Sequence, residues 1–222
     1  MTDRRREFLE ALEALEGEFG ASLDDEKRAR LADYFESVER WNARLHLVAP
    51  CPPREFAARH VLESLVALEH LPRGARVIDV GSGAGLPIIP CLVARDDLRA
   101  ALYEANAKKS VFLREAISAL GLRDAARVVN SRFEDAEAPD AEAVTCRALE
   151  RFAEALPRLV SWSPARATLL LFGGESLRES IESAGLSCEA VRIPLSERRF
   201  LFVARHNDSA VVVGSAGEVS GG

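Results

Sequence analysis

The sequence lacks an apolar run of the length, about 18 residues, that a membrane-spanning helix needs. Its first residues, MTDRRRE, are charged and lack the apolar core of a secretion signal. Cysteine is scarce, and Cys51, Cys91, Cys146 and Cys188 form no C-x-x-C pair, which argues against a zinc site and a disulfide framework. We therefore expect a cytoplasmic protein without a metal and without a membrane contact.

An excess of basic residues is also missing, since 35 acidic residues outnumber 29 basic ones and the net charge is -6. Proteins that bind nucleic acid mainly through its phosphates are usually basic. An acidic chain can still dock on structured RNA through a local basic face. Arginines gather in three places, which are Arg4 to Arg6, the stretch holding Arg147, Arg151 and Arg158, and Arg198 with Arg199. For the first of these we expect an ordinary solvated surface paired with acidic side chains.

The order of the expected elements predicts one α/β domain behind a helical extension, in keeping with 222 residues that are 48% hydrophobic. Apolar residues at helical spacing predict helices over 5–17 and 24–45, and a third helix follows over 54–71. From residue 76 onward strands and helices alternate, which predicts a parallel sheet with right-handed crossovers. The predicted strands are 76–80, 100–103, 126–129, 143–146, 167–172, 188–193 and 199–205, and the predicted helices between them are 107–120, 150–160 and 176–184.

The last two strands have no helix between them and therefore predict an antiparallel hairpin. We divide the chain into a helical cap over 1–72, a ligand-binding domain over 73–206 and a tail over 207–222. The tail is rich in Gly, Ser and Ala, and we expect it to be mobile.

The stretch VIDVGSGAGLPIIP, residues 77–90, is the strongest sign of a ligand. A strand that turns through Gly81, Gly83 and Gly85 brings bare backbone against a bound molecule, because glycine has no Cβ and tolerates positive φ. The dinucleotide fingerprint G-x-G-x-x-G would need a third glycine where this chain has Leu86. The spacing therefore predicts a nucleoside-type cofactor and weakens the case for a pyrophosphate.

A second anchor follows at the end of the next predicted strand, where Glu104 stands about 20 residues beyond the glycines. An ionised carboxylate only accepts hydrogen bonds, so it matches the two vicinal hydroxyl donors of a ribose. The alternative is a solvated carboxylate at a strand end.

The glycine turn resembles that of S-adenosylmethionine-dependent methyltransferases, in which an acid precedes G-x-G-x-G. Six motifs, the glycine turn among them, occur in the order and spacing of one family. They are WNARLHLV from Trp41, RHVLESL from Arg59, DVGSGAGLPIIP from Asp79, EANAKKSVFL from Glu104, SRFED from Ser131 and TCRAL from Thr145. Over residues 25–205 the chain resembles the bacterial small-subunit ribosomal RNA (guanine-N7) methyltransferases, also called the glucose-inhibited division protein B family.

This resemblance implies a Rossmann-like fold with a seven-stranded, mostly parallel sheet and a helical N-terminal cap, S-adenosylmethionine as the cofactor, and ribosomal RNA or the small ribosomal subunit as the partner of a monomeric enzyme. The implied cofactor-binding residues are Gly81, Gly83, Leu86, Glu104, Phe133, Glu134 and Arg147. Among them Glu104 would hold the ribose, and Phe133 with Glu134 would meet the adenine. Arg147 would lie near the methionine end and the incoming RNA, with an ion pair to Glu150 or Glu154 as the alternative.

Three positions depart from the family pattern. Ile88 replaces a glycine after GLP, HLV at 46–48 replaces N-L-T, and Phe172 precedes Gly173 where the family carries a lysine. His60 and Glu63 share one helix face, and we expect them to brace the cap against the cofactor domain.

The expected chemistry needs no catalytic dyad. Guanine N7 carries a lone pair and no proton, so holding it in line with the methyl group can supply most of the catalysis. Enzymes that methylate exocyclic amines usually show D/N-P-P-Y/F where this chain reads Thr145-Cys146-Arg147, so that class is disfavoured. Cytosine-C5 enzymes need a cysteine nucleophile, commonly after a proline, but Cys91 after Pro90 falls inside the helix expected after the glycine turn, and we assign it to the core. Two alternatives remain, a methyltransferase for a small molecule or protein and a non-catalytic cofactor-binding assembly protein.

Overall fold

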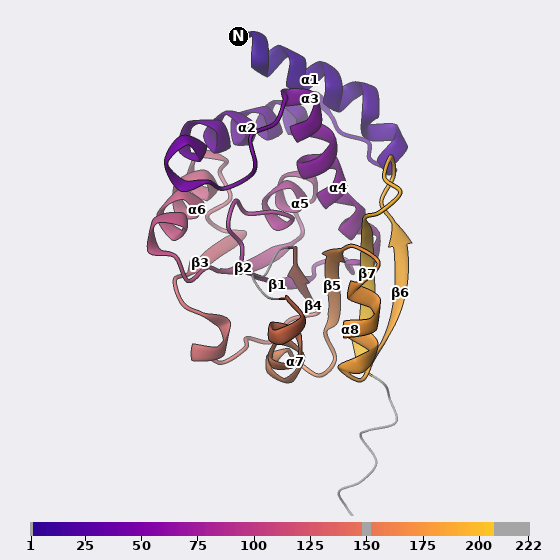
Figure 1. Ribbon diagram of the computed structural model, residues 1–222. Coiled ribbons are helices and arrows are strands. Elements are labelled where there is room, and N and C mark those ends of the chain that lie inside the picture. The colour runs from indigo at the N-terminus through magenta and orange to yellow at the C-terminus, as the bar shows by residue number, and fades with distance from the viewer. Residues whose placement is uncertain (1, 148–151, 207–222) are drawn as a thin grey trace, which may run out of the picture.

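A seven-stranded sheet forms the centre of the molecule (Figure 1). The computed structural model describes residues 2–147 and 152–206, apart from the side chain of Ala153. The strands lie in the order β3-β2-β1-β4-β5-β7-β6. Their bounds are β1 Arg76–Val80, β2 Arg99–Tyr103, β3 Ala126–Val129, β4 Ala143–Cys146, β5 Thr168–Gly173, β6 Leu186–Arg192 and β7 Phe200–His206. The first five are parallel and β7 pairs antiparallel with both neighbours, which confirms the predicted terminal hairpin.

Helices cover both faces of this sheet (Figure 1). The longer ones begin at side-chain caps, since Asp24 accepts from the Lys27 N–H at 2.8 Å and Asn106 from the Lys108 N–H at 2.9 Å. The helical elements are α1 Asp3–Leu15, η1 Glu16–Phe19, α2 Asp25–Leu45, α3 Pro53–Phe56, η2 Ala57–Leu62, α4 Glu63–Leu65, η3 Val66–His70, α5 Ile88–Ala94, α6 Ala107–Ala119, η4 Phe133–Asp135, α7 Phe152–Trp162 and α8 Leu177–Ser183.

The alternation of side chains along the strands divides the core into two apolar clusters. Val77 belongs to the cluster that joins the sheet to the cap, α5 and α6. Its neighbour Ile78 points to the opposite face, where α7 and α8 pack. The cap therefore shares one continuous core with the sheet. Its outer surface is held by ion pairs from Arg4, Arg5 and Arg6 to acidic side chains, as expected for that cluster.

The third helix of the cap differs from the regular helix predicted over 54–71. Its middle, η2, is a π-helix in which the Glu63 N–H donates back five residues to Ala58. The carbonyl oxygens of Arg59 and His60 in this wide turn accept hydrogen bonds from the side chain of Arg147. A side chain that donates to the carbonyl oxygens of a helix is a physical reason for such a bulge. Here the donor, Arg147, lies outside the helix, so the sequence of the helix alone could not predict the bulge.

Most other boundaries lie within two residues of the prediction. The first helix ends earlier than expected, at Leu15, and a 3₁₀ turn continues to Gly20, whose φ of +65° ends it. The predicted helix over 150–160 is observed as Phe152–Trp162, and residues 148–151, which include Glu150 and Arg151, lie outside the described residues. The predicted tail over 207–222 also lies outside them.

Candidate functional site

The candidate site lies where the strand order reverses, between β1 and β4. In open parallel sheets the loops that follow two such strands diverge, and the crevice between them takes ligands. The glycine turn follows β1 directly, Glu104 follows β2 and Arg147 follows β4. The parallel register brings all three to the same carboxyl edge of the sheet, as their predicted positions at strand ends imply.

The glycines of the turn have different tasks. Gly83 has a φ of +52°, and a Cβ added to it would meet nothing closer than the Gly81 carbonyl oxygen at 3.7 Å. Gly85 has a φ of +85°, and its added Cβ would overlap Ile89, whose Cγ1 would be 2.7 Å away. Gly83 thus leaves open space that a ligand can enter. Gly85 instead serves the packing of α5, because any side chain at this position would overlap Ile89.

Glu104 is held against the glycine turn. It is buried, with 8% of its surface exposed. Its Oε2 accepts from the Gly83 N–H at 2.8 Å and its Oε1 from the Asn106 N–H at 2.7 Å. Its carbonyl oxygen accepts from Ser110 and Asn130 as well. The carboxylate is therefore fixed in place, and each oxygen keeps a second lone pair that can accept from a ribose hydroxyl.

Asp79, the third residue of the β1 run VIDV, is fully buried at this edge of the sheet. Its Oδ1 accepts from the Thr145 hydroxyl at 2.7 Å, and its Oδ2 has no partner among the described residues. Burial raises the pKa of this carboxyl to about 7, while the Thr145 hydrogen bond opposes the rise. A buried polar atom without a partner beside the glycine turn fits a site built for a ligand with hydrogen-bond donors.

Tyr34 connects the cap to the same turn. It is fully buried on α2, and its hydroxyl donates to the Ala84 carbonyl oxygen at 2.7 Å. From the sequence, this residue is only one of the apolar positions of the helix predicted over 24–45, and its contact with the turn was missed. The signal was present, because a tyrosine on a buried helix face needs a partner for its hydroxyl.

The two residues expected at the adenine lie after β3. The ring of Phe133 is buried against Trp162, with centroids 5.3 Å apart. The exposed Glu134 forms an ion pair with Arg158 at 3.6 Å. Leu86, the remaining member of the predicted set, is buried directly after Gly85. Since the Phe133 side chain fills the core, a contact from this residue to a base would have to come from its backbone.

Arg147 points to the cap. Its guanidinium donates to the carbonyl oxygens of Arg59 and His60, to the Ser64 hydroxyl at 3.2 Å and to Glu63 at 3.2 Å. Desolvation lowers the pKa of Arg147, and the negative charge of Glu63 opposes this. Arg147 forms an ion pair with Glu63 of the cap, while Glu150, one of the two alternative partners, lies outside the described residues. Glu63 thus braces the cap against the sheet as predicted.

The three departures from the family pattern fall in different surroundings. Ile88 is completely buried at the start of α5. Phe172 lies under the guanidinium of Arg147, with the Arg147 Cζ 5.8 Å from its ring centroid. His46 ends α2 with a left-handed φ of +49°. Cys91 is buried within α5, which confirms its assignment to the core.

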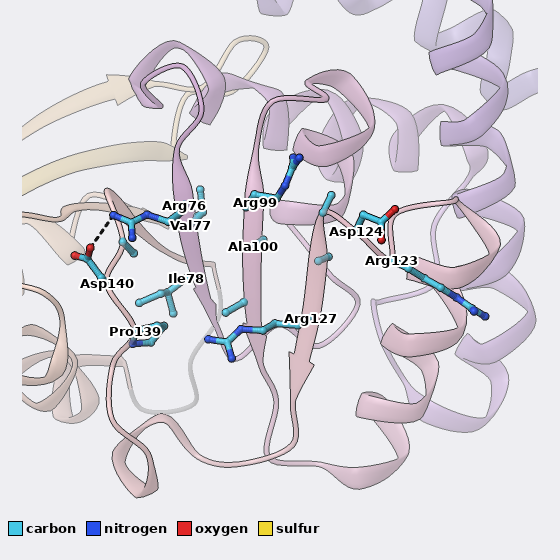
Figure 2. A pocket seen from close by; sticks show the side chains of 14 residues that line it. Arg76, Val77, Ile78, Arg99, Ala100, Arg123, Asp124, Arg127, Pro139 and Asp140 are labelled. Atoms are coloured by element: carbon cyan, nitrogen blue, oxygen red, sulfur yellow. Dashed lines mark ion pairs between the residues drawn. The ribbon is translucent and has the colours of Figure 1, made fainter.

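A cavity of about 290 Å³ opens at the opposite, amino edge of the sheet. Figure 2 shows that Arg99 and Arg123 point away from one another there, while Arg76 forms an ion pair with Asp140 at 2.8 Å. The arginines around this cavity therefore do not converge on one point. Among residues 2–147 and 152–206, no group of three or more His, Cys, Asp or Glu could hold a metal ion. In the same residues no helix is long and apolar enough to cross a membrane.

The strand order, the reversal between β1 and β4 and the glycine turn with its acid define a Rossmann-like S-adenosylmethionine-dependent methyltransferase fold. A solved ribosomal protein L11 methylase from Lactobacillus delbrueckii shares this fold, with a TM-score of 0.55 at 13% identity over 67% of this chain and 79% of that one. The family model for rRNA small subunit methyltransferase G matches residues 27–201.

Two relatives agree with the family model, and both are named ribosomal RNA small subunit methyltransferase G. The protein from Neisseria meningitidis is 36% identical over 168 residues, which are 76% of this chain and 77% of the relative. The protein from Yersinia enterocolitica is 34% identical over 90% of this chain and all of the relative. The chain belongs to the rRNA small subunit methyltransferase G family, and it is an enzyme of the S-adenosylmethionine-dependent class.

Proposed function

We propose that this protein transfers the methyl group of S-adenosylmethionine to N7 of a guanine in small-subunit ribosomal RNA, acting as a monomer in the cytoplasm. The observation that carries the proposal is the match to the family across both the cap and the sheet, residues 27–201. A shared cofactor domain alone would leave the substrate open. The match also takes in most of the cap, which lies outside the glycine turn and its acid, and this inclusion supports the ribosomal substrate.

The residues at the carboxyl edge fit the cofactor. Glu104, fixed by the Gly83 and Asn106 amides, would accept hydrogen bonds from the ribose hydroxyls. The open space above Gly83 would take the methionine part, with Gly81 and Leu86 along its side. Residues Phe133 and Glu134 would border the adenine. Arg147 would face the methionine end from β4, with its guanidinium held by the cap.

The cofactor supplies an electrophilic methyl group on a positively charged sulfur. The protein then has to hold guanine N7 in line with that group at contact distance and to keep water out. No general base is required, because N7 has a lone pair and carries no proton. Tyr34 and Glu104 would contribute indirectly by fixing the glycine turn from both sides.

The test is methyl transfer from labelled S-adenosylmethionine to small ribosomal subunits, and to free ribosomal RNA, from cells that lack the corresponding gene. A 7-methylguanine carries a fixed positive charge that makes the RNA cleavable at that base after mild reduction and aniline treatment. We expect one cleavage that depends on the protein. Label on another base, on a ribosomal protein or on a small molecule would contradict the proposal.

A further inference from the structure

A buried carboxylate at the carboxyl edge of the sheet holds two arginines. Glu63 has only 3% of its side chain exposed. Its Oε2 lies 3.2 Å from Arg147 Nη2, and its Oε1 accepts from Arg199 Nε at 2.6 Å. Among residues 2–147 and 152–206, the cluster therefore contains two positive charges and one negative charge. Since an unbalanced charge is costly away from water, the cluster favours an additional anion.

Arg199 is the member of this cluster that is open to a ligand. Its side chain is 37% exposed, and of its guanidinium nitrogens only Nε donates to Glu63. Both Nη groups lack a protein partner among residues 2–147 and 152–206. Two backbone contacts fix its main chain, because the Arg199 N–H donates to the Ser196 hydroxyl at 3.2 Å and its carbonyl accepts from the Ile193 N–H at 3.0 Å. The guanidinium is thus anchored on one side and offers its outer donors on the other.

The sheet register places Arg199 on the substrate side. Phe200 pairs with Gly173, the last residue of β5, so Arg199 stands at the same edge as the glycine turn. The turn between β6 and β7 reaches toward the cap there (Figure 1). Three strand spacings of about 4.8 Å separate β7 from β1, or about 14 Å between backbones. Arg199 is therefore too far along the edge to belong to the glycine turn itself.

We propose that Arg199, anchored through Nε to Glu63, binds a backbone phosphate of the substrate RNA next to the methylated base. A guanidinium suits this task, because its planar fork can pair with a carboxylate and a phosphate at the same time. Glu63 is a positioning residue, which keeps the fork at the rim of the site. The inference depends on the proposed RNA substrate, and it also explains how a chain of net charge -6 can provide positive charge beside the chemistry.

The experiment compares Arg199→Ala with Arg205→Ala. Arg205 is exposed at the opposite end of the same strand, so its removal changes the net charge equally. For Arg199→Ala we expect the KM for small ribosomal subunits to rise roughly tenfold, as for the loss of one charge-assisted contact. The slope of log affinity for subunits against log salt should become shallower by about one. Affinity for S-adenosylmethionine, measured by calorimetry, and thermal stability should stay close to those of Arg205→Ala.

Arg199→Lys tests the fork. A lysine has a single ammonium group, which Glu63 would engage, so we expect little recovery of the KM. A wild-type KM in Arg199→Lys would show that a guanidinium anchored on Glu63 is not required. An unchanged KM and salt slope in Arg199→Ala would overturn the proposed phosphate contact. If Arg199→Ala lost only affinity for S-adenosylmethionine, the anion bound by Arg199 would be the carboxylate of the cofactor, which would also overturn the proposal. Wild-type protein that forms no 7-methylguanine would instead contradict the proposed function.

Discussion

The Tyr34 hydroxyl on α2 donates a 2.7 Å hydrogen bond to the Ala84 carbonyl oxygen, between Gly83 and Gly85. The cap thereby contacts the backbone of the glycine turn directly. On the other side of the turn, Glu104 accepts from the Gly83 N–H. The turn is clamped between the cap and β2, so a change in the cap should reach the cofactor through this contact.

Tyr34→Phe tests this clamp. The change leaves the Ala84 carbonyl without its partner in a buried place, and we expect a loss of about 1 to 3 kcal/mol in the free energy of unfolding. Affinity for S-adenosylmethionine should fall as well, which calorimetry on the folded protein measures. Tyr103→Phe is the control, because the hydroxyl of this buried tyrosine makes only a 3.4 Å contact with Glu137. Equal cofactor affinity in both variants would show that the clamp does not affect binding.

The turn glycines should respond differently to substitution. Gly83→Val should abolish cofactor binding in a folded protein, because its side chain would enter open space above the turn. Gly85→Ala should mainly destabilise the fold, by about 1 to 3 kcal/mol, because its Cβ would overlap Ile89.

The overlap with Ile89 can be relieved by Ile89→Ala, which removes both the Cδ1 and the Cγ1 atoms that the added Cβ would meet. The double variant should then lose less stability in chemical denaturation than the sum of the two single variants. Strict additivity would attribute the effect of Gly85→Ala to its positive φ alone.

Glu104→Ala should weaken S-adenosylmethionine binding by about 1 to 3 kcal/mol, the range for hydrogen bonds to a charged group. Glu104→Gln should lose less, because its amide oxygen can still accept from one of the two backbone N–H groups. Calorimetry measures the affinity of both variants, and thermal melts measure their stability. The control is Glu189→Ala, on the exposed side of β6. A collapse of stability with normal affinity in the folded fraction would make Glu104 a structural residue.

The raised pKa of Asp79 predicts that the free energy of unfolding depends on pH. Its pKa is about 7 in the folded protein and 3.8 in the reference state, so between these values the folded chain retains a proton that the unfolded chain has lost. The stabilisation from this group is complete below pH 4 and is lost as the pH rises to about 7. Asp79→Asn removes the titration.

The difference in free energy of unfolding between wild type and Asp79→Asn should therefore shift in favour of Asp79→Asn as the pH is raised from about 4 to about 7. Chemical denaturation of both proteins at several pH values provides the test. A constant difference over this range would show that Asp79 does not titrate there.

The sequence by itself determined the elements and their order. Strands such as 76–80 and 143–146 are short, mostly apolar runs bounded by polar or turn residues, and this local pattern favours a buried strand. The antiparallel hairpin followed from the missing crossover, and Glu104 followed from its distance to the glycines. These inferences needed only neighbours along the chain.

Only the tertiary structure decided which side chains from distant segments meet. The π-helical turn at Ala57–Leu62 is accompanied by donors from Arg147, some 87 residues away in the sequence. Glu63 lies between Arg147 and Arg199 because β4, β5 and β7 are neighbours in the sheet although they are far apart along the chain. The separate tasks of Gly83 and Gly85 depend on where α5 packs. Hydrogen bonds and packing contacts act over a few ångströms in space, and one sequence read along its length does not contain those distances.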